Sequence, residues 1–358
     1  MPLPRSLNRF DPGRRAATLG AFSLAALAVT GRPSDALPSR PGADLNESTV
    51  TTAELATRAF ADLEAKYGGR LVRPALARML AHEVTPRLAT PTSTRVARRM
   101  FVAASQLAYL CAFASFDERR DALAEHYYLT ALDLARHSVD PATHAITLRA
   151  MSVQAHDLGR HRTSLHLAEA ALSAGSGSLP GVQQAFLLGQ LSVARAADGD
   201  RHGALGALAE AERSLEKATS AGTSVHDTST GRYHPASLAH QRAEVLVQLG
   251  DRHGAIAALT CSVDQRPPSE RRSRALLTAR LAELHLTCGH LDQATATWHR
   301  FLNGYPALAS ARADHAYRTM LTRTRPLSRQ PAARDLLDRA ADISANARGD
   351  VGGEPSGW

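Results

Sequence analysis

The hexapeptide GDRHGA occurs twice in this chain, at 199–204 and again at 250–255. A looser copy precedes this pair (GRHRTS) and another follows it (GHLDQA), and each of the four lies between segments with helical apolar spacing. A glycine can end a helix in the left-handed conformation without steric cost, and an aspartate directly after it can cap the next helix. The repeat therefore predicts a series of helical hairpins. Their turns are expected at Gly159, Gly199, Gly250 and Gly289.

Composition supports helices over sheets, because Ala and Leu dominate and aromatic residues make up 5% of the chain. Small residues recur five positions after each turn glycine and seven positions before it, which lets paired helices approach closely. The first set is Ser164, Ala204, Ala255 and Ala294, and the second is Ser152, Ser192, Ala243 and Ala282. This pattern is typical of tetratricopeptide (TPR) repeats, with longer spacing than usual. The predicted fold is all-α, a TPR-like α-solenoid of about five helical hairpins with flanking capping helices.

The predicted organisation has five parts. Residues 1–48 form an N-terminal arm, 49–92 a helical hairpin, 93–304 the TPR-like repeats, 305–346 the C-terminal capping helices, and 347–358 a disordered tail.

The N-terminal arm leaves two interpretations of localisation open. Arg14 and Arg15 precede the apolar run AATLGAFSLAALAVT, which is shorter than the roughly 20 residues of a membrane span. We therefore expect no stable span. The run is either part of a cytoplasmic protein's arm or a twin-arginine-like export signal. The widely separated Cys111, Cys261 and Cys288 suit reduced thiols in the cytoplasm.

Three stretches carry a family resemblance: YGGRLVRPALARMLAHEVTPRL, FVAASQLAYLCAFASFDERRDALAEHYYLTALDLA and MSVQAHDLGRH. Over about residues 50–345 the chain resembles the TPR portion of actinobacterial, Streptomyces-type helix-turn-helix/TPR transcriptional regulators. The resemblance implies a regulatory protein that acts through interactions. Residues 1–50 do not match the DNA-binding domain of those regulators, so direct DNA binding is doubtful.

Charge and motifs favour no catalytic class. The net charge of +8 comes mostly from arginines spread along the chain, and short clusters such as Arg271, Arg272 and Arg274 are expected on solvated faces. Neither HExxH nor GxSxG occurs, and GSGSLPG at 175–181 lacks the context of a phosphate loop. The turn histidines belong to separate hairpins, so we expect no metal site. The chain is predicted to be a non-enzyme without a cofactor.

The first helix of each pair should line a concave groove. Projecting the repeat onto that groove gives mixed charged and polar side chains, which suit a protein or peptide partner. They are Gln106, Tyr109, Arg149, His156, Asp157, His240, Glu244, Gln248 and Glu283. The expected function is a regulatory or scaffold protein in transcriptional or developmental regulation. The alternatives are an exported binding protein, and a remnant or fragment of a DNA-binding regulator.

Overall fold

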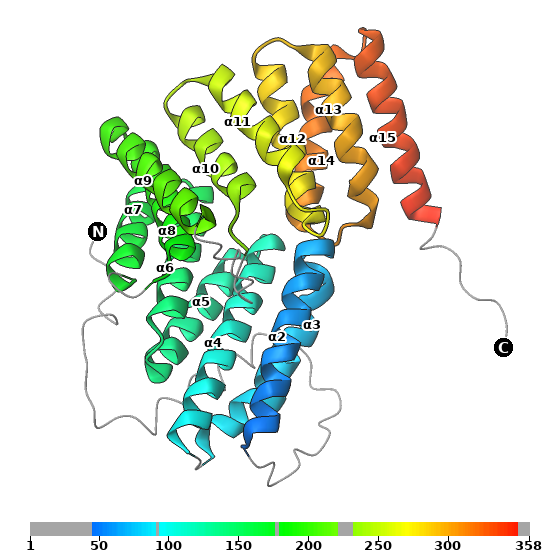
Figure 1. Cartoon of the computed structure of the whole chain (residues 1–358). Helices are drawn as coiled ribbons and strands as arrows, with labels where there is room; N and C mark the ends of the chain where they lie inside the picture. The colour runs from blue at the N-terminus through cyan, green and yellow to red at the C-terminus, as the bar shows by residue number, and fades with distance from the viewer. Residues whose placement is uncertain (1–44, 91–92, 176–178, 221–231, 350–358) are drawn as a thin grey trace, which may run out of the picture.

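The computed structural model describes residues 45–90, 93–175, 179–220 and 232–349, and these residues form helices and connecting turns without any strand (Figure 1). Arg14, Arg15 and most of the predicted arm lie outside the described residues. So do parts of the 175–181 linker and of the C-terminal tail. The last helix runs to Gly349, past the predicted start of the tail.

Consecutive helices pack in pairs, and five pairs from α4–α5 to α12–α13 stand between a first pair, α2–α3, and a last pair, α14–α15. The long helices are α2 (Glu47–Tyr67), α3 (Gly69–Arg78), α4 (Thr94–Asp117), α5 (Asp121–Ser138), α6 (Pro141–Asp157), α7 (His161–Ala174), α8 (Gly181–Ala197), α9 (Arg201–Ser220), α10 (Pro235–Gln248), α11 (Arg252–Gln265), α12 (Arg271–Thr287), α13 (Leu291–Gly304), α14 (Ala311–Thr324) and α15 (Pro331–Gly349). Short turns complete them: η3 (Met79–Val84, π), η4 (Thr85–Ala89), η5 (Tyr305–Ala307) and η6 (Arg325–Leu327).

The four turn glycines adopt the left-handed conformation expected of them, with φ of 69° at Gly159, 90° at Gly199, 83° at Gly250 and 80° at Gly289. A β-carbon at any of these positions would meet no atom within 4 Å, so backbone conformation, and not space, selects glycine there.

The second glycine of GDRHGA has a separate role. The side chain of Asp251 caps α11 by accepting a hydrogen bond from the Gly254 N–H at 2.8 Å, and Asp200 does the same for Gly203. A β-carbon on Gly254 would lie 2.4 Å from the Asp251 carboxylate, and one on Gly203 would lie 2.0 Å from Asp200. The glycine three residues after the capping aspartate therefore leaves room for its carboxylate in the observed position.

Small side chains fill the contact between paired helices. Ser152 of α6 and Ser164 of α7 are fully buried, and each hydroxyl donates to the other residue's carbonyl, at 2.8 and 2.9 Å. The equivalent residues of the other pairs are also buried, namely Ser192, Ala204, Ala243, Ala255, Ala282 and Ala294.

Two turns depart from the glycine pattern. Arg119, in the turn between α4 and α5, takes a φ of 57°, and Val139, after α5, takes 55°. These residues adopt the conformation that glycine provides elsewhere, at a steric cost that a β-branched side chain raises further.

Helix α4 is the one helix among the described residues that is long and apolar enough to cross a membrane by length and composition. Its best window has a mean hydropathy of 1.3, and 78% of that window is buried inside the protein. Cys111 on this helix is fully buried, and burial raises the pKa of its thiol to about 12.

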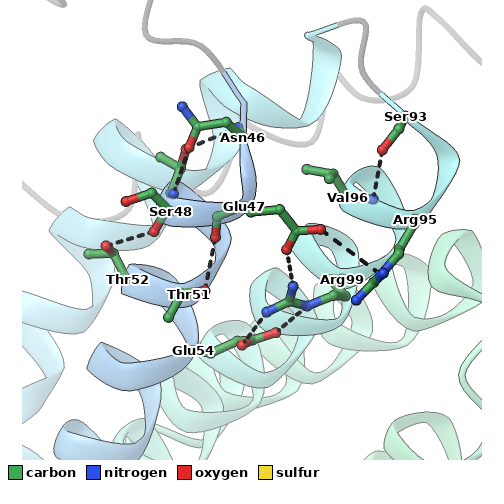
Figure 2. Close-up of polar contacts among 11 residues, drawn as sticks. Asn46, Glu47, Ser48, Thr51, Thr52, Glu54, Ser93, Arg95, Val96 and Arg99 are labelled. Carbon is green, nitrogen blue, oxygen red and sulfur yellow. Dashed lines mark hydrogen bonds and ion pairs between the residues drawn. The ribbon is translucent and has the colours of Figure 1, made fainter.

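Arginine side chains join the first hairpin to α4. Asn46 caps α2, and Arg99 of α4 forms a two-pronged ion pair with Glu54, at 2.8 and 3.0 Å (Figure 2). Arg99 also contacts Glu47, and Figure 2 shows both carboxylates of α2 turned toward the same guanidinium. These contacts orient α2 against the N-terminal half of α4.

The series of hairpins curves back on itself, so that its last helices contact its first hairpin (Figure 1). The Tyr67 carbonyl accepts a hydrogen bond from the Ala309 N–H at 2.6 Å, and the Arg70 N–H donates to the Ala309 carbonyl at 3.0 Å. A β-carbon on Gly68 would lie 2.7 Å from the Ala309 oxygen, and one on Gly69 would lie 2.3 Å from the Ala114 oxygen. Adjacent glycines therefore permit three distant segments to meet, and the helices form a closed ring.

Candidate binding cavity

The ring surrounds a partly open cavity of about 780 Å³. Every helix residue in its described wall belongs to the first helix of a hairpin, that is α2, α4, α6, α8, α10, α12 or α14, and the remaining wall residues lie in adjoining turns. The volume lies within the range of small-molecule and cofactor sites, about 300–1,000 Å³.

Most of the side chains predicted to face a groove line this cavity. Eight do so: Tyr109, Arg149, His156, Asp157, His240, Glu244, Gln248 and Glu283. Gln106 does not line it and is half-buried about one turn before Tyr109 on α4. The expected groove takes the form of a partly open cavity, because α2 at the start of the series packs against α12 near its end.

A buried ion-pair cluster joins α2, α4 and α12 at the cavity wall. The Arg272 guanidinium lies 2.9 Å from a Glu64 oxygen and 3.5 Å from an Asp117 oxygen. Asp117 accepts two further hydrogen bonds, from the Gly69 N–H at 2.9 Å and from the Ser310 hydroxyl at 2.8 Å. The solvated position expected for Arg272 is therefore wrong, since this side chain is 5% exposed and holds α2, α4 and α12 together.

The cluster has one more carboxylate than guanidinium groups. Burial raises the pKa of Glu64, Arg272 lowers it, and the charge of Asp117 raises it. The combined effect is a pKa of about 7. Burial also disfavours the charged form of Arg272, but the two carboxylates outweigh this and raise its pKa.

A second buried cluster lies where α11 leads into α12. Arg266 donates to Glu270 at 2.6 Å, and the His234 ring nitrogen lies 2.9 Å from the other Glu270 oxygen. Burial disfavours the Glu270 charge, yet the hydrogen bond with His234 and the charge of Arg266 lower its pKa. This cluster fixes the connection that leads into the cavity wall.

Looser ion pairs also lie in the cavity wall, within α12, between α10 and α12, and between α6 and α14. Arg280 lies 3.7 Å from Glu244 and 3.6 Å from Glu283, and Arg312 lies 3.5 Å from Asp157. These pairs leave most of the predicted acidic residues compensated by a neighbouring arginine.

His240 lies among the wall helices but keeps 38% of its side-chain surface accessible, in the cavity. Burial lowers its pKa to about 4, although nearby Glu244 acts in the opposite direction. The pKa of His156 is also lowered by burial. Both imidazoles are therefore neutral at pH 7, where each can donate one hydrogen bond and accept another.

Arg149 has a different environment. Its guanidinium carbon lies 3.9 Å from the centre of the Phe186 ring, and its Nε is buried without a hydrogen-bond partner. Within the described part of the chain no carboxylate pairs with it. Burial lowers its pKa, with Tyr109, Tyr233 and Tyr128 acting in the opposite direction. An arginine still remains charged at neutral pH, so the cavity holds a positive charge without a counterion.

Sequence reasoning missed the aromatic part of the wall, which includes Phe113, Phe186 and Tyr233. Phe186 and Tyr233 pack with ring centres 4.9 Å apart, and the Tyr233 hydroxyl donates to Gln241 at 2.7 Å. Gly189 makes room for this pair, since a β-carbon there would lie 1.9 Å from the Gln241 oxygen. A glycine inside the apolar helix 181–197 was the sequence signal for this close approach. Tyr127 and Tyr128 are both buried.

Histidines of neighbouring turns approach each other more closely than their separation in sequence suggested. The rings of His253 and His290 lie 6.3 Å apart, and those of His285 and His290 lie 6.2 Å apart. Among the residues with described positions, no group of three or more His, Cys, Asp and Glu side chains is placed to hold a metal ion.

Comparisons with other proteins give no family assignment. No protein-family model matches the chain, and a search of curated proteins gives no match.

Proposed function

We propose that this chain is a non-enzymatic regulatory or scaffold protein that binds a peptide, or a peptide segment of a partner protein, in its central cavity. The observation that carries the proposal is the convergence of eight polar and charged side chains from four different helices on one cavity of about 780 Å³. They offer hydrogen-bond donors and acceptors at several depths, as recognition of a peptide backbone requires.

The proposal includes a TPR-like architecture for the seven helical hairpins. Its support is the left-handed glycine at four turns and the small buried residues between paired helices. The resemblance to the TPR portion of transcriptional regulators supports the proposal of a role in transcriptional or developmental regulation, in the cytoplasm. Binding of the partner would change the arrangement of the helices in the ring, or would depend on that arrangement.

The test is capture of partners by tagged full-length protein from its own cells. The cavity variant replaces Arg149, His156 and Glu244 by alanine, and the control replaces Arg213, Glu216 and Lys217, which are exposed on α9 away from the cavity. Wild type and control should retain the same partner in comparable amounts, and the cavity variant should lose at least about 90% of it, more than 1.4 kcal/mol in binding.

Circular dichroism should show that both variants keep the helical content of the wild type. Retention of the partner by a folded cavity variant would contradict binding in the cavity.

A further inference from the structure

The charges of the cavity wall do not balance locally. Arg232, Arg266, Arg272, Arg280 and Arg312 each lie within 4 Å of a carboxylate. Arg58 and Arg119 are exposed at the rim. Arg149 is therefore the interior arginine of the described wall that lacks a carboxylate partner. A buried charge without a counterion is costly, and a ligand that supplies the opposite charge would recover that cost.

A second unpartnered donor belongs to the same part of the wall. Gln241 is 4% exposed, its oxygen accepts from Tyr233, and its Nε2 is buried without a hydrogen-bond partner. Phe186 connects the two donors, since its ring contacts the Arg149 guanidinium on one side and packs against Tyr233 on the other. Both unpartnered atoms are donors, so they favour a ligand group that accepts hydrogen bonds and carries negative charge.

The rest of the wall restricts this ligand further. Apolar side chains such as Phe113, Val153 and Leu276 line the same cavity and suit an apolar body. Glu64, Glu244 and Glu270 also line it, but each is already paired with an arginine, so Arg149 is left to bind a single negative charge.

We propose that the cavity binds an organic monocarboxylate with an apolar body, and that Arg149 and Gln241 hold its carboxylate. Arg149 is positioned for this by stacking on Phe186, and Gln241 by the hydroxyl of Tyr233. This inference rests on the proposed binding role of the cavity and names the chemistry of its ligand. The carboxylate can belong to a free small acid or to the C-terminus of a short peptide.

The first experiment compares 2-naphthoate with the uncharged 2-naphthamide by isothermal titration calorimetry on the full-length protein at pH 7.5 and low salt. Naphthoate should bind at least about tenfold more tightly than the amide, because only the carboxylate can pair with the guanidinium. Arg149→Gln should abolish this difference, whereas Arg213→Gln, on an exposed surface away from the cavity, should preserve it.

Equal binding of acid and amide to the wild type, or no binding of either at about 5 mM, would overturn the proposal. So would an unchanged preference for the acid in Arg149→Gln. If Arg149→Gln loses its helical circular dichroism signal, this variant is left out of the test. The test then rests on the acid–amide comparison with the wild type and with the charge-conserving variant Arg149→Lys.

The second experiment identifies the source of the carboxylate. The tripeptide acetyl-Leu-Leu-Phe is compared with its C-terminal amide in the same titration. A preference for the free acid of the tripeptide indicates a peptide C-terminus. Arg149-dependent binding of naphthoate alone indicates a small free acid. A further outcome is that the triple alanine variant of the cavity loses its partner while every acid binds as tightly as its amide. That result would support the proposed function and refute the proposal that the cavity binds a carboxylate.

Discussion

At the scale of single residues, the turn glycines show why some positions tolerate only one amino acid. Gly250 has a φ of 83° and open space where a β-carbon would stand. Gly206 also has open space, but it lies inside the exposed face of α9 with ordinary helical geometry. Alanine substitutions at Gly250 and Gly206 therefore separate the effect of backbone strain on stability from the effect of packing.

Gly250→Ala should lower the free energy of unfolding by about 1 kcal/mol, because alanine is strained at positive φ. Gly206→Ala should raise it by about 0.5–1 kcal/mol, since alanine is the better helix former. Urea unfolding followed by circular dichroism measures both changes. Destabilisation by Gly206→Ala, or no effect of Gly250→Ala, would contradict this account.

The sequence predicts these glycine positions because a repeated motif marks them. It does not predict Arg119 and Val139, which adopt the same conformation without a glycine. Both residues are exposed and end a helix in a turn that the next N–H closes, from Arg120 to the Ser115 carbonyl at 2.9 Å and from Asp140 to the Ala135 carbonyl at 3.4 Å.

At the scale of helices, long-range ion pairs decide how the elements close on each other. Arg272 is predicted from sequence to be solvated because it stands in a run of arginines, but α12 turns this one residue toward Glu64 and Asp117. Its partners lie 208 and 155 residues away in the chain. Helical spacing identifies the elements, but it contains no information about which distant elements meet.

Arg272→Ala should lower the free energy of unfolding by about 3–5 kcal/mol, because two carboxylates would remain buried without their partner. The matched control is Arg300→Ala, which removes an exposed ion pair with Asp264 and should change it by less than about 1 kcal/mol. Thermal and urea unfolding provide the comparison. Similar small losses in the two variants would show that the buried cluster contributes no more than a surface pair.

At the scale of the whole molecule, the protonation of Glu64 couples ring closure to pH. The folded-state pKa of about 7 stands above the usual glutamate value of 4.5. The stability associated with this group is fully present below about pH 4.5 and is lost as pH rises through about 7, because the folded state then holds a proton that the unfolded chain has released.

Between pH 5 and pH 8 the wild type should therefore lose stability on the order of 3 kcal/mol from this group. Glu64→Gln, which keeps the shape of the side chain without titrating, should flatten the pH dependence over this range. The measurement is the urea midpoint at half-unit pH intervals. An identical slope in the variant and the wild type would contradict the assignment to Glu64.

The candidate site could be predicted in part, because cavity-facing positions follow the repeat frame on α6, α10 and α12. Gln106 falls outside the cavity because only the C-terminal part of α4, from Tyr109 on, lines it. The aromatic wall and the lack of a carboxylate beside Arg149 could not be predicted, since they depend on how α6, α8 and the turn before α10 pack together.

Closure also limits how a protein of this shape can diverge. An open array can gain or lose a hairpin by duplication or deletion, since each unit contacts only its neighbours. Here the Gly68–Gly69 turn must reach Ala309 after a fixed number of hairpins, so an added or missing unit would separate those two segments. Variation that preserves the ring is thus confined to substitutions and to the length of outward loops. The capacity of the cavity is set by the number of hairpins around it.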